Sequence, residues 1–154
     1  ATVETFCSYL SDILKSDLLS FFVIDNEIPS PLIIKGNEKP SEEELNSFKQ
    51  SNSFEHLSSK KEAYLSNHIY NEELGCFLDF STKNEIPAEI GVPLFSANEK
   101  AMLMNNLNVP TESKLFGLLI VKRSKLFSSK EFELISRLVT QTGAILWRLY
   151  QKDK

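Results

Sequence analysis

The sequence predicts an α+β domain with a central antiparallel sheet of five to six strands. The N- and C-terminal helices cover one face of this sheet, and a cap of helix and loop covers the other. Three observations support this fold class. Both ends of the chain carry apolar residues at helical spacing, the apolar runs between them are short, and the first two strands are joined by a short turn. A chain of 154 residues, 42% of them hydrophobic, is long enough to bury its own core.

The first 36 residues are predicted to form a helix followed by two strands. Apolar side chains recur at helical spacing at Val3, Phe6, Cys7, Leu10, Ile13 and Leu14. Cys7 lies within this stripe, so we interpret it as a small buried hydrophobe. A strand at Leu18–Ile24, a turn at residues 25–29 and a second strand at Leu32–Lys35 follow.

Residues 37–87 are predicted to form the cap. Ser41, followed by Glu44 three residues later, makes a capping box that starts a helix running to about Gln50. The remainder is the least regular part of the sequence. It is expected to hold short strands near Ala63–Leu65 and His68–Tyr70, a short helix at Glu72–Phe80 and a loop at 81–87.

Two further strands are expected at Ala88–Phe95 and Leu115–Lys122, separated by a long connection. Pro93 indicates an edge, an end or a bulge in the first of them. The second is apolar at successive positions, so we expect both of its faces to be covered.

The last helix begins with a second capping box. Ser128 stands at the N-cap and Glu131 three residues later, and Phe127 is placed to contact Phe132 as a hydrophobic staple. The helix should then continue to about Tyr150.

The apolar residues of this helix cover an arc of roughly 160°, which is wider than one contact with a sheet requires. They are Phe132, Leu134, Ile135, Leu138, Val139, Thr142, Ile145, Leu146 and Leu149. Trp147 falls outside the arc, on the far side of the helix. A second contact surface is therefore predicted, either with the N-terminal helix or with a partner chain.

Three stretches of the chain resemble one family. They are Phe21–Asp25, Ile90–Leu94, and Phe116–Val121 with the capping box at 127–131 and the long helix that contains Gln141 and Ala144. On these stretches the chain resembles a GAF domain, the small sensory module of signalling proteins, over nearly its whole length. The resemblance implies a cytoplasmic sensory or regulatory domain that binds a small molecule between sheet and cap.

The ligand-specific motifs of that family are mostly missing. Members that bind cyclic nucleotides carry Asn-Lys, then Phe, then Asp-Glu, and here only Phe127 and the acid Glu131 correspond. Members that bind bilins use a Cys that is often followed by His, whereas Cys76 is followed by Phe77. Free-methionine-sulfoxide reductases of this fold use several Cys in the cap, and this chain has one there. We therefore leave the cofactor unknown, and we expect no enzyme activity and no metal site.

The cap nevertheless combines aromatic side chains with a few polar ones, as small-ligand sites do. The predicted ligand-binding residues are Phe54, Tyr64, His68, Tyr70, Cys76, Phe77 and Phe80. The alternative is that these aromatic rings only close the core over the sheet.

Two functions follow from these expectations. In the first, a small ligand changes the arrangement of the terminal helices, which pass the signal to an output domain in the parent chain. In the second, the domain is a ligand-free dimerisation module. Both involve a homodimer through the terminal helices, with Phe6, Leu10, Leu138, Ile145, Trp147 and Leu149 at the predicted interface.

Composition argues against some partners, and the N-terminus favours an excised domain. A net charge of −4 provides no basic surface for nucleic acid, and no apolar run is long enough to insert across a membrane. The first residue is not Met, and we expect residues 1–154 to be a single domain excised from a longer multidomain protein, which could itself be anchored to a membrane.

Overall fold

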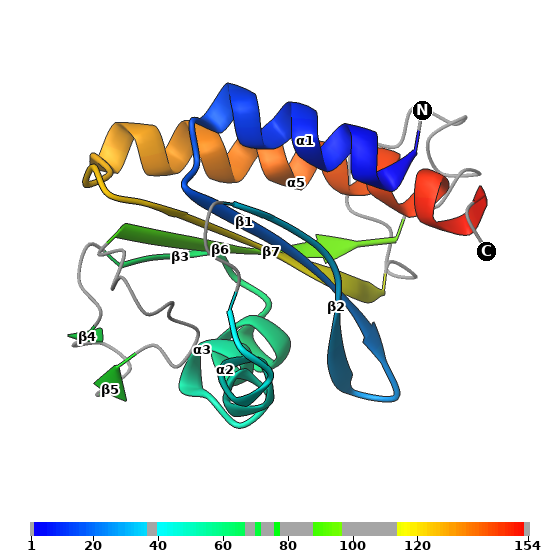
Figure 1. Cartoon of the computed structure of the whole chain (residues 1–154), viewed down its shortest axis with the longest axis horizontal. Coiled ribbons are helices and arrows are strands. Elements are labelled where there is room, and N and C mark those ends of the chain that lie inside the picture. The colour runs from blue at the N-terminus through cyan, green and yellow to red at the C-terminus, as the bar shows by residue number, and fades with distance from the viewer. Residues whose placement is uncertain are drawn as a thin grey trace.

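A five-stranded antiparallel sheet with the strand order β2-β1-β7-β6-β3 forms the centre of the molecule (Figure 1). The computed structural model describes residues 2–36, 40–66, 70–71, 76–77, 88–96 and 114–152. The strands of this sheet are β1 (Leu18–Asp25), β2 (Ile28–Gly36), β3 (Tyr64–Ser66), β6 (Ala88–Phe95) and β7 (Leu115–Arg123). A separate two-stranded pair consists of β4 (Tyr70–Asn71) and β5 (Cys76–Phe77).

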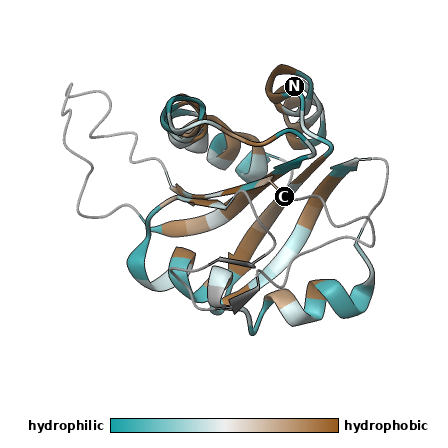
Figure 2. Cartoon of the chain, turned by 90° about the vertical axis from the view of Figure 1, so that its left-hand side faces the viewer, coloured by the Kyte–Doolittle hydropathy of each residue, from teal (hydrophilic) through white to brown (hydrophobic). Residues whose placement is uncertain are grey.

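The two long helices, α1 (Val3–Leu14) and α5 (Ser129–Lys152), lie on one side of the sheet. The cap, made of α2 (Glu42–Phe48), α3 (Asn52–Glu55) and the π-helix η1 (His56–Lys60), lies on the other (Figure 2). The strands β1 and β7 pair at the centre of the sheet. The predicted three-layer arrangement is therefore confirmed.

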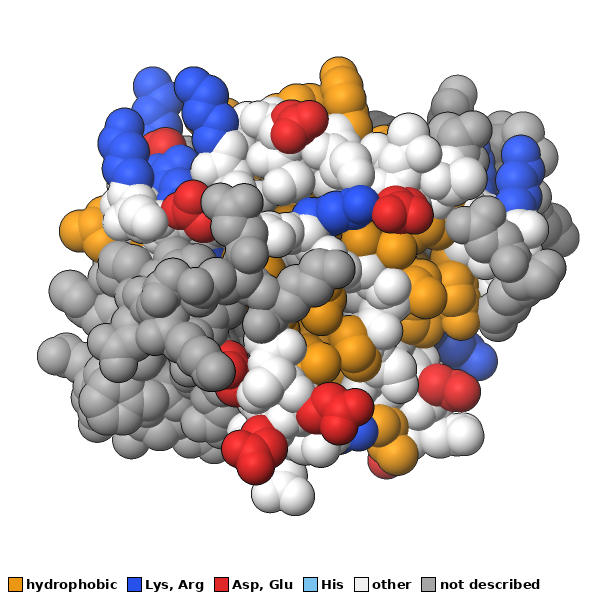
Figure 3. All heavy atoms as spheres, viewed as in Figure 1, with side chains coloured by type: hydrophobic (Ala, Val, Ile, Leu, Met, Phe, Trp, Pro, Cys, Tyr) orange, Lys and Arg blue, Asp and Glu red, His pale blue; other side chains and the backbone are white. Residues whose placement is uncertain are grey.

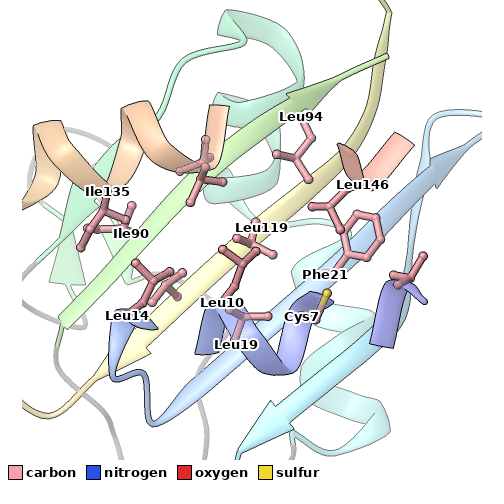
Figure 4. Close-up of a cluster of buried hydrophobic side chains, with 14 of the residues drawn as sticks. Cys7, Leu10, Leu14, Leu19, Phe21, Ile90, Leu94, Leu119, Ile135 and Leu146 are labelled. Atoms are coloured by element: carbon pink, nitrogen blue, oxygen red, sulfur yellow. The ribbon is translucent and has the colours of Figure 1, made fainter. Parts of the chain in front are cut away.

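Side chains alternate between the two faces of each strand, as the pleat requires. In β1, Leu19 and Phe21 face the helices, whereas Leu18 and Phe22 face the cap. The helix-side core is apolar and includes Cys7, which is fully buried as predicted (Figure 4). Burial raises the pKa of the Cys7 thiol to about 12, although the nearby charge of Lys35 opposes the rise.

The β1–β2 hairpin is tighter than predicted. The strand β2 begins at Ile28 rather than Leu32, after a two-residue turn in which Asn26 and Glu27 have φ of 52° and 64°. Pro29 lies in β2 rather than in the predicted turn. It is tolerated in β2 because this is an edge strand, where a missing N–H breaks no ladder.

The edge strand also exposes apolar residues. Ile28 and Leu32 are about half exposed, and hydrophobic side chains are visible on this side of the molecule between the helix layer and the cap (Figure 3). Prolines on this strand oppose the addition of a further strand.

The cap is more helical than predicted at residues 52–60, because Ser51 starts a new helical turn where α2 ends. Its hydroxyl donates to the Phe48 carbonyl at 2.7 Å and accepts from the Phe54 N–H at 3.0 Å. The strand expected near Ala63–Leu65 is confirmed as β3. The helix expected at Glu72–Phe80 is wrong at Cys76 and Phe77, which form β5, and the other residues of that segment lie outside the described ones.

The capping box that starts α5 is confirmed. The Ser128 hydroxyl accepts from the Glu131 N–H, and the Glu131 carboxylate accepts from the Ser128 N–H, both at 3.0 Å. Phe127 is buried in the helix-side core, and Phe132 packs against the same cluster. The guanidinium of Arg123 donates to Glu131 at 2.7 Å, and this bond, together with the Ser128 N–H, lowers the pKa of Glu131 to about 2.

Candidate functional site

Charged side chains are buried between the sheet and the cap. Glu89 on β6 and Lys122 on β7 are register partners, and both point towards the cap. The Lys122 Nζ lies 3.1 Å from the Glu89 Oε1, and their side chains are only 2% and 4% exposed. The Tyr64 hydroxyl on β3 donates to the other oxygen, Oε2, at 2.5 Å. We call Tyr64, Glu89 and Lys122 the Glu89 cluster.

A glycine allows Tyr64 to reach Glu89. Gly91 on β6 is the register partner of Tyr64, and the tyrosine ring lies across it. A Cβ at position 91 would collide with this ring. The missing side chain therefore places the phenol beside the carboxylate two residues along β6.

The electrostatics of the cluster favour a neutral tyrosine. Burial raises the pKa of Tyr64 well above its usual value, and the charge of Glu89 and the hydrogen bond to it raise it further. Ser53 lies beside the phenol and has a smaller, opposite effect, without reaching hydrogen-bonding geometry. The Glu89 carboxylate is thus held by one cation and one neutral donor. Taking such a pair out of water costs several kcal/mol per ion before their attraction offsets it.

Further polar atoms are buried near the cluster without hydrogen-bond partners among the described residues. They are the hydroxyls of Ser20 and Ser53 and the Nδ1 of His56. The His56 ring stands edge-on to Tyr64, with a centroid distance of 6.1 Å. Ser20 lies on the cap-facing side of β1, opposite Ile120 of β7. A buried polar group without a partner costs about 1–3 kcal/mol, which a bound polar molecule would relieve.

Of the seven predicted ligand-binding residues, Tyr64 is the one that the structure places in this cluster. Phe54 packs against Phe48, and the Phe48 ring stacks on Phe22 of β1 with a centroid distance of 4.7 Å. Phe54 therefore helps to close the cap over β1. The other five contribute no described side chain: His68 and Phe80 lie outside the described residues, and Tyr70, Cys76 and Phe77 are described only as strand backbone.

Glu89 and Lys122 were not predicted from the sequence as site residues. Each is a charged residue within a strand that is otherwise largely apolar and fully covered. The two charges have opposite signs, and β6 and β7 were predicted to be strands. That combination was the signal available in the sequence.

Five of the six predicted interface residues fall into three groups. Leu10 is only 2% exposed within the core of its own chain, so it offers no surface to a partner in this arrangement. Phe6 and Leu149 are half-buried against the same core. Leu138 and Ile145 are 37% and 44% exposed and remain available for contact.

Trp147 does not lie on the far side of α5. Its ring packs edge-on against Phe116 of β7 with a centroid distance of 5.0 Å. The reason is the close approach of α5 to the sheet at Gly143, whose Cβ position would be 3.6 Å from the backbone of Phe95. Trp147, one turn later on the same side, therefore reaches the sheet.

The described residues contain neither a candidate membrane span nor a candidate metal cluster. None of the described helices is both long enough and apolar enough to cross a membrane. Within the same residues, no three His, Cys, Asp or Glu side chains gather closely enough to hold a metal ion.

Comparison with known proteins identifies the fold. No family model matches the sequence, and no curated protein matches it. Solved structures do match over almost the whole chain. A GAF domain/HD domain protein from Geobacter sulfurreducens has a TM-score of 0.60 at 14% identity, with 97% of this chain and 94% of that chain covered.

Two further solved structures also match the fold over almost the whole chain. The GAF domain of a phosphoenolpyruvate-protein phosphotransferase from Acinetobacter has a TM-score of 0.58 at 13% identity, covering 98% of this chain and 83% of that chain. A type II free methionine-R-sulfoxide reductase from Thermoplasma acidophilum has a TM-score of 0.59 at 14% identity, covering 97% and 89%. Together with the strand order and the three layers, these likenesses show that the chain has a GAF-domain fold.

Proposed function

We propose that this chain is a sensory or regulatory domain that binds a small polar molecule between its sheet and its cap. The observation that carries the proposal is the Glu89–Lys122 ion pair, which is buried beneath the cap beside polar atoms that have no described partner. A pair of hydrophobic residues would fill the same space with less desolvation. Ligand recognition gives a reason to keep the charges there.

The signal would leave through α1 and α5. The two helices contact each other on the opposite face of the same sheet, and they hold both ends of the chain. Lys122 is followed by Arg123, which holds the start of α5 through its bond to Glu131. A change at the Glu89 cluster therefore has a short covalent route along β7 to α5. Coupling requires the ligand to bind one arrangement of the helices more tightly than the other.

We also propose that the domain is not a catalyst of thiol chemistry, although one structure of similar fold is a reductase. A thiol–disulfide exchange mechanism needs a second, resolving Cys. Cys7 is fully buried in the helix-side core, and its pKa is raised to about 12, so it is a poor nucleophile.

A thermal-shift screen with nucleotides, tetrapyrroles and organic acids tests the binding proposal. A ligand at a hundred times its dissociation constant stabilises the native state by about 2.7 kcal/mol. The shift should be reduced in Tyr64→Phe, which removes one donor of the cluster. It should persist in Tyr9→Phe, a matched change at a tyrosine that is 62% exposed on α1. An equal reduction of the ligand-induced thermal shift in both variants would count against a binding site at the Glu89 cluster.

The second candidate is a ligand-free dimerisation module. It is favoured by the packed aromatic stack of Phe22, Phe48 and Phe54, and by apolar side chains exposed on the outer helices. The most exposed of these are Tyr9, Ile13, Leu134, Leu138 and Ile145. Sedimentation at micromolar concentration should give a dimer that Ile145→Lys converts to a monomer. A wild-type monomer would remove this candidate and the helical signal route through a dimer.

A further inference from the structure

A hollow opens at the other end of the sheet, away from the Glu89 cluster. It has a volume of about 620 Å³ and lies between the β1–β2 turn, the cap and the first residues of β7. Its apolar wall consists of Ile24, Phe54 and Leu115, all of them half-buried. Leu115 is seven residues from Lys122 along β7, which is about 23 Å of extended strand. The hollow and the Glu89 cluster are therefore separate places.

The rim of this hollow carries two lysines and one glutamate, Glu27, so its formal charge is positive by one. Lys61 follows η1 and Lys114 precedes β7, and both are exposed. Neither ammonium group forms an ion pair with any residue in the described parts of the chain. The backbone of Lys114 is fixed, because its N–H donates to the Ser96 hydroxyl at 3.1 Å and its carbonyl accepts from the Ser96 N–H at 2.8 Å. The Ser58 hydroxyl also lines the hollow, and it donates to the Glu55 carbonyl at 3.3 Å.

Two of the lining residues have backbone conformations that side chains other than glycine rarely adopt. Lys61 has φ of 56°, and Glu27 in the β1–β2 turn has φ of 64°. Glu27 completes the two-residue β1–β2 turn and Lys61 is the left-handed cap that ends η1, so turn geometry fixes the backbone at two edges of the hollow.

The same wall borders a second hollow of about 440 Å³, which reaches α5. Ile24, Lys114 and Leu115 line both hollows, and Trp147 and Tyr150 line the second one. A molecule resting on Ile24 and Leu115 therefore lies one side chain away from the last turns of α5. Trp147 is the single tryptophan of the chain, so its fluorescence reports on this end of the sheet.

From these observations we propose that the hollow at the β1–β2 turn is a binding site for a small organic anion with an apolar body. The anionic group would pair with Lys61 and Lys114 at the rim, and the apolar body would lie on Ile24, Phe54 and Leu115. The site is independent of any ligand at the Glu89 cluster. Its occupancy would act on α5 through the wall that the two hollows share.

Titration of the chain with hydrocinnamate, an aromatic carboxylate, tests the proposal. The expected result is a saturable change in Trp147 emission, with binding confirmed by calorimetry. Lys61→Gln and Lys114→Gln should each weaken binding by about 2–5-fold, the scale of one exposed charge pair. Lys60→Gln is the matched control, because Lys60 is an exposed neighbour on η1 that does not line the hollow.

Two further probes separate the contribution of the ligand's charge from that of its apolar body. Hydrocinnamyl alcohol keeps the apolar body without the charge, and acetate keeps the charge without the body, so both should bind more weakly than hydrocinnamate. Tyr64→Phe should leave hydrocinnamate binding unchanged, which distinguishes this site from the one under Proposed function. The inference is overturned if hydrocinnamate fails to saturate up to millimolar concentrations, if the alcohol binds equally well, or if Lys60→Gln weakens binding as much as Lys61→Gln.

Discussion

The two faces of the sheet are built from different kinds of side chain. The face under α1 and α5 is a continuous apolar core, in which the thiol of Cys7 is buried and kept neutral. The face under the cap mixes apolar residues with the buried Glu89 cluster and with polar atoms that lack described partners. Burial is nearly complete on both faces, so the contrast lies in chemistry rather than in exposure.

This difference predicts that the two faces contribute to stability in different ways. The helix-side core gains free energy in proportion to the apolar area that it removes from water. The cap side keeps a buried ion pair, which is weak evidence for stability because desolvation opposes the attraction. The first face is therefore expected to respond to changes in volume, and the second to changes in charge.

The largest expected effect is the removal of one buried charge from the cap side. Lys122→Met leaves the Glu89 carboxylate without its cation in a site that is almost fully enclosed. Breaking such a pair costs about 3–5 kcal/mol. Urea denaturation should show this as a lower free energy of unfolding with an unchanged slope. A loss below 1 kcal/mol would mean that water reaches the pair freely.

The helix face should respond to lost volume. Leu119→Ala removes a fully buried side chain between β7 and the helices and should cost about 3 kcal/mol. The matched control is Leu134→Ala on α5, whose side chain is 57% exposed and which should stay within about 0.5 kcal/mol of wild type. If urea denaturation shows the same loss of unfolding free energy in both variants, the apolar core does not carry the stability assigned to it.

The helix cap at the start of α5 should have a smaller effect. Ser128→Ala removes the hydroxyl that accepts from the Glu131 N–H, and it should cost about 1 kcal/mol. Ligand response should not change, since Ser128 lies away from the cap of the sheet. A variant of normal stability with an altered ligand response would show that Ser128 contacts a ligand.

The smallest effect concerns pH. The pKa of Glu131 falls from 4.5 to about 2 in the folded chain, chiefly through the Arg123 hydrogen bond. A lowered pKa means that the carboxylate stabilises the fold above pH 4.5, and that this contribution is lost as the pH falls from 4.5 towards 2. Glu131→Gln should therefore flatten the acid limb of the stability profile in that window. An acid limb that does not differ from wild type would show that Glu131 does not titrate there.

The parts of the fold that depend on local pattern could be predicted from the sequence. Helical spacing and two capping boxes placed α1, α2 and α5, and the apolar runs placed β1, β6 and β7. Pro29 misled the prediction for β2, because a proline reads as a turn signal until the strand is known to lie at an edge. Trp147 was misplaced because a helical wheel does not show how closely α5 approaches the sheet at Gly143.

The candidate site was harder to predict because it depends on register. Glu89 and Lys122 are 33 positions apart, and only the pairing of β6 with β7 makes them neighbours. Tyr64 was predicted for its residue type, but its contact with Glu89 depends on the missing side chain of Gly91. A search for opposite charges within buried strands would have found the pair.

The most direct test of the contrast between the two faces is the free energy of unfolding of a triple variant, Tyr64→Phe with Glu89→Leu and Lys122→Met. It replaces the whole Glu89 cluster by apolar side chains of similar size. If the charges serve ligand binding, the variant should be as stable as wild type or more stable, since such replacements are often neutral or stabilising by about 1–4 kcal/mol. A triple variant as unstable as Lys122→Met alone would contradict the account and make the cluster a structural element.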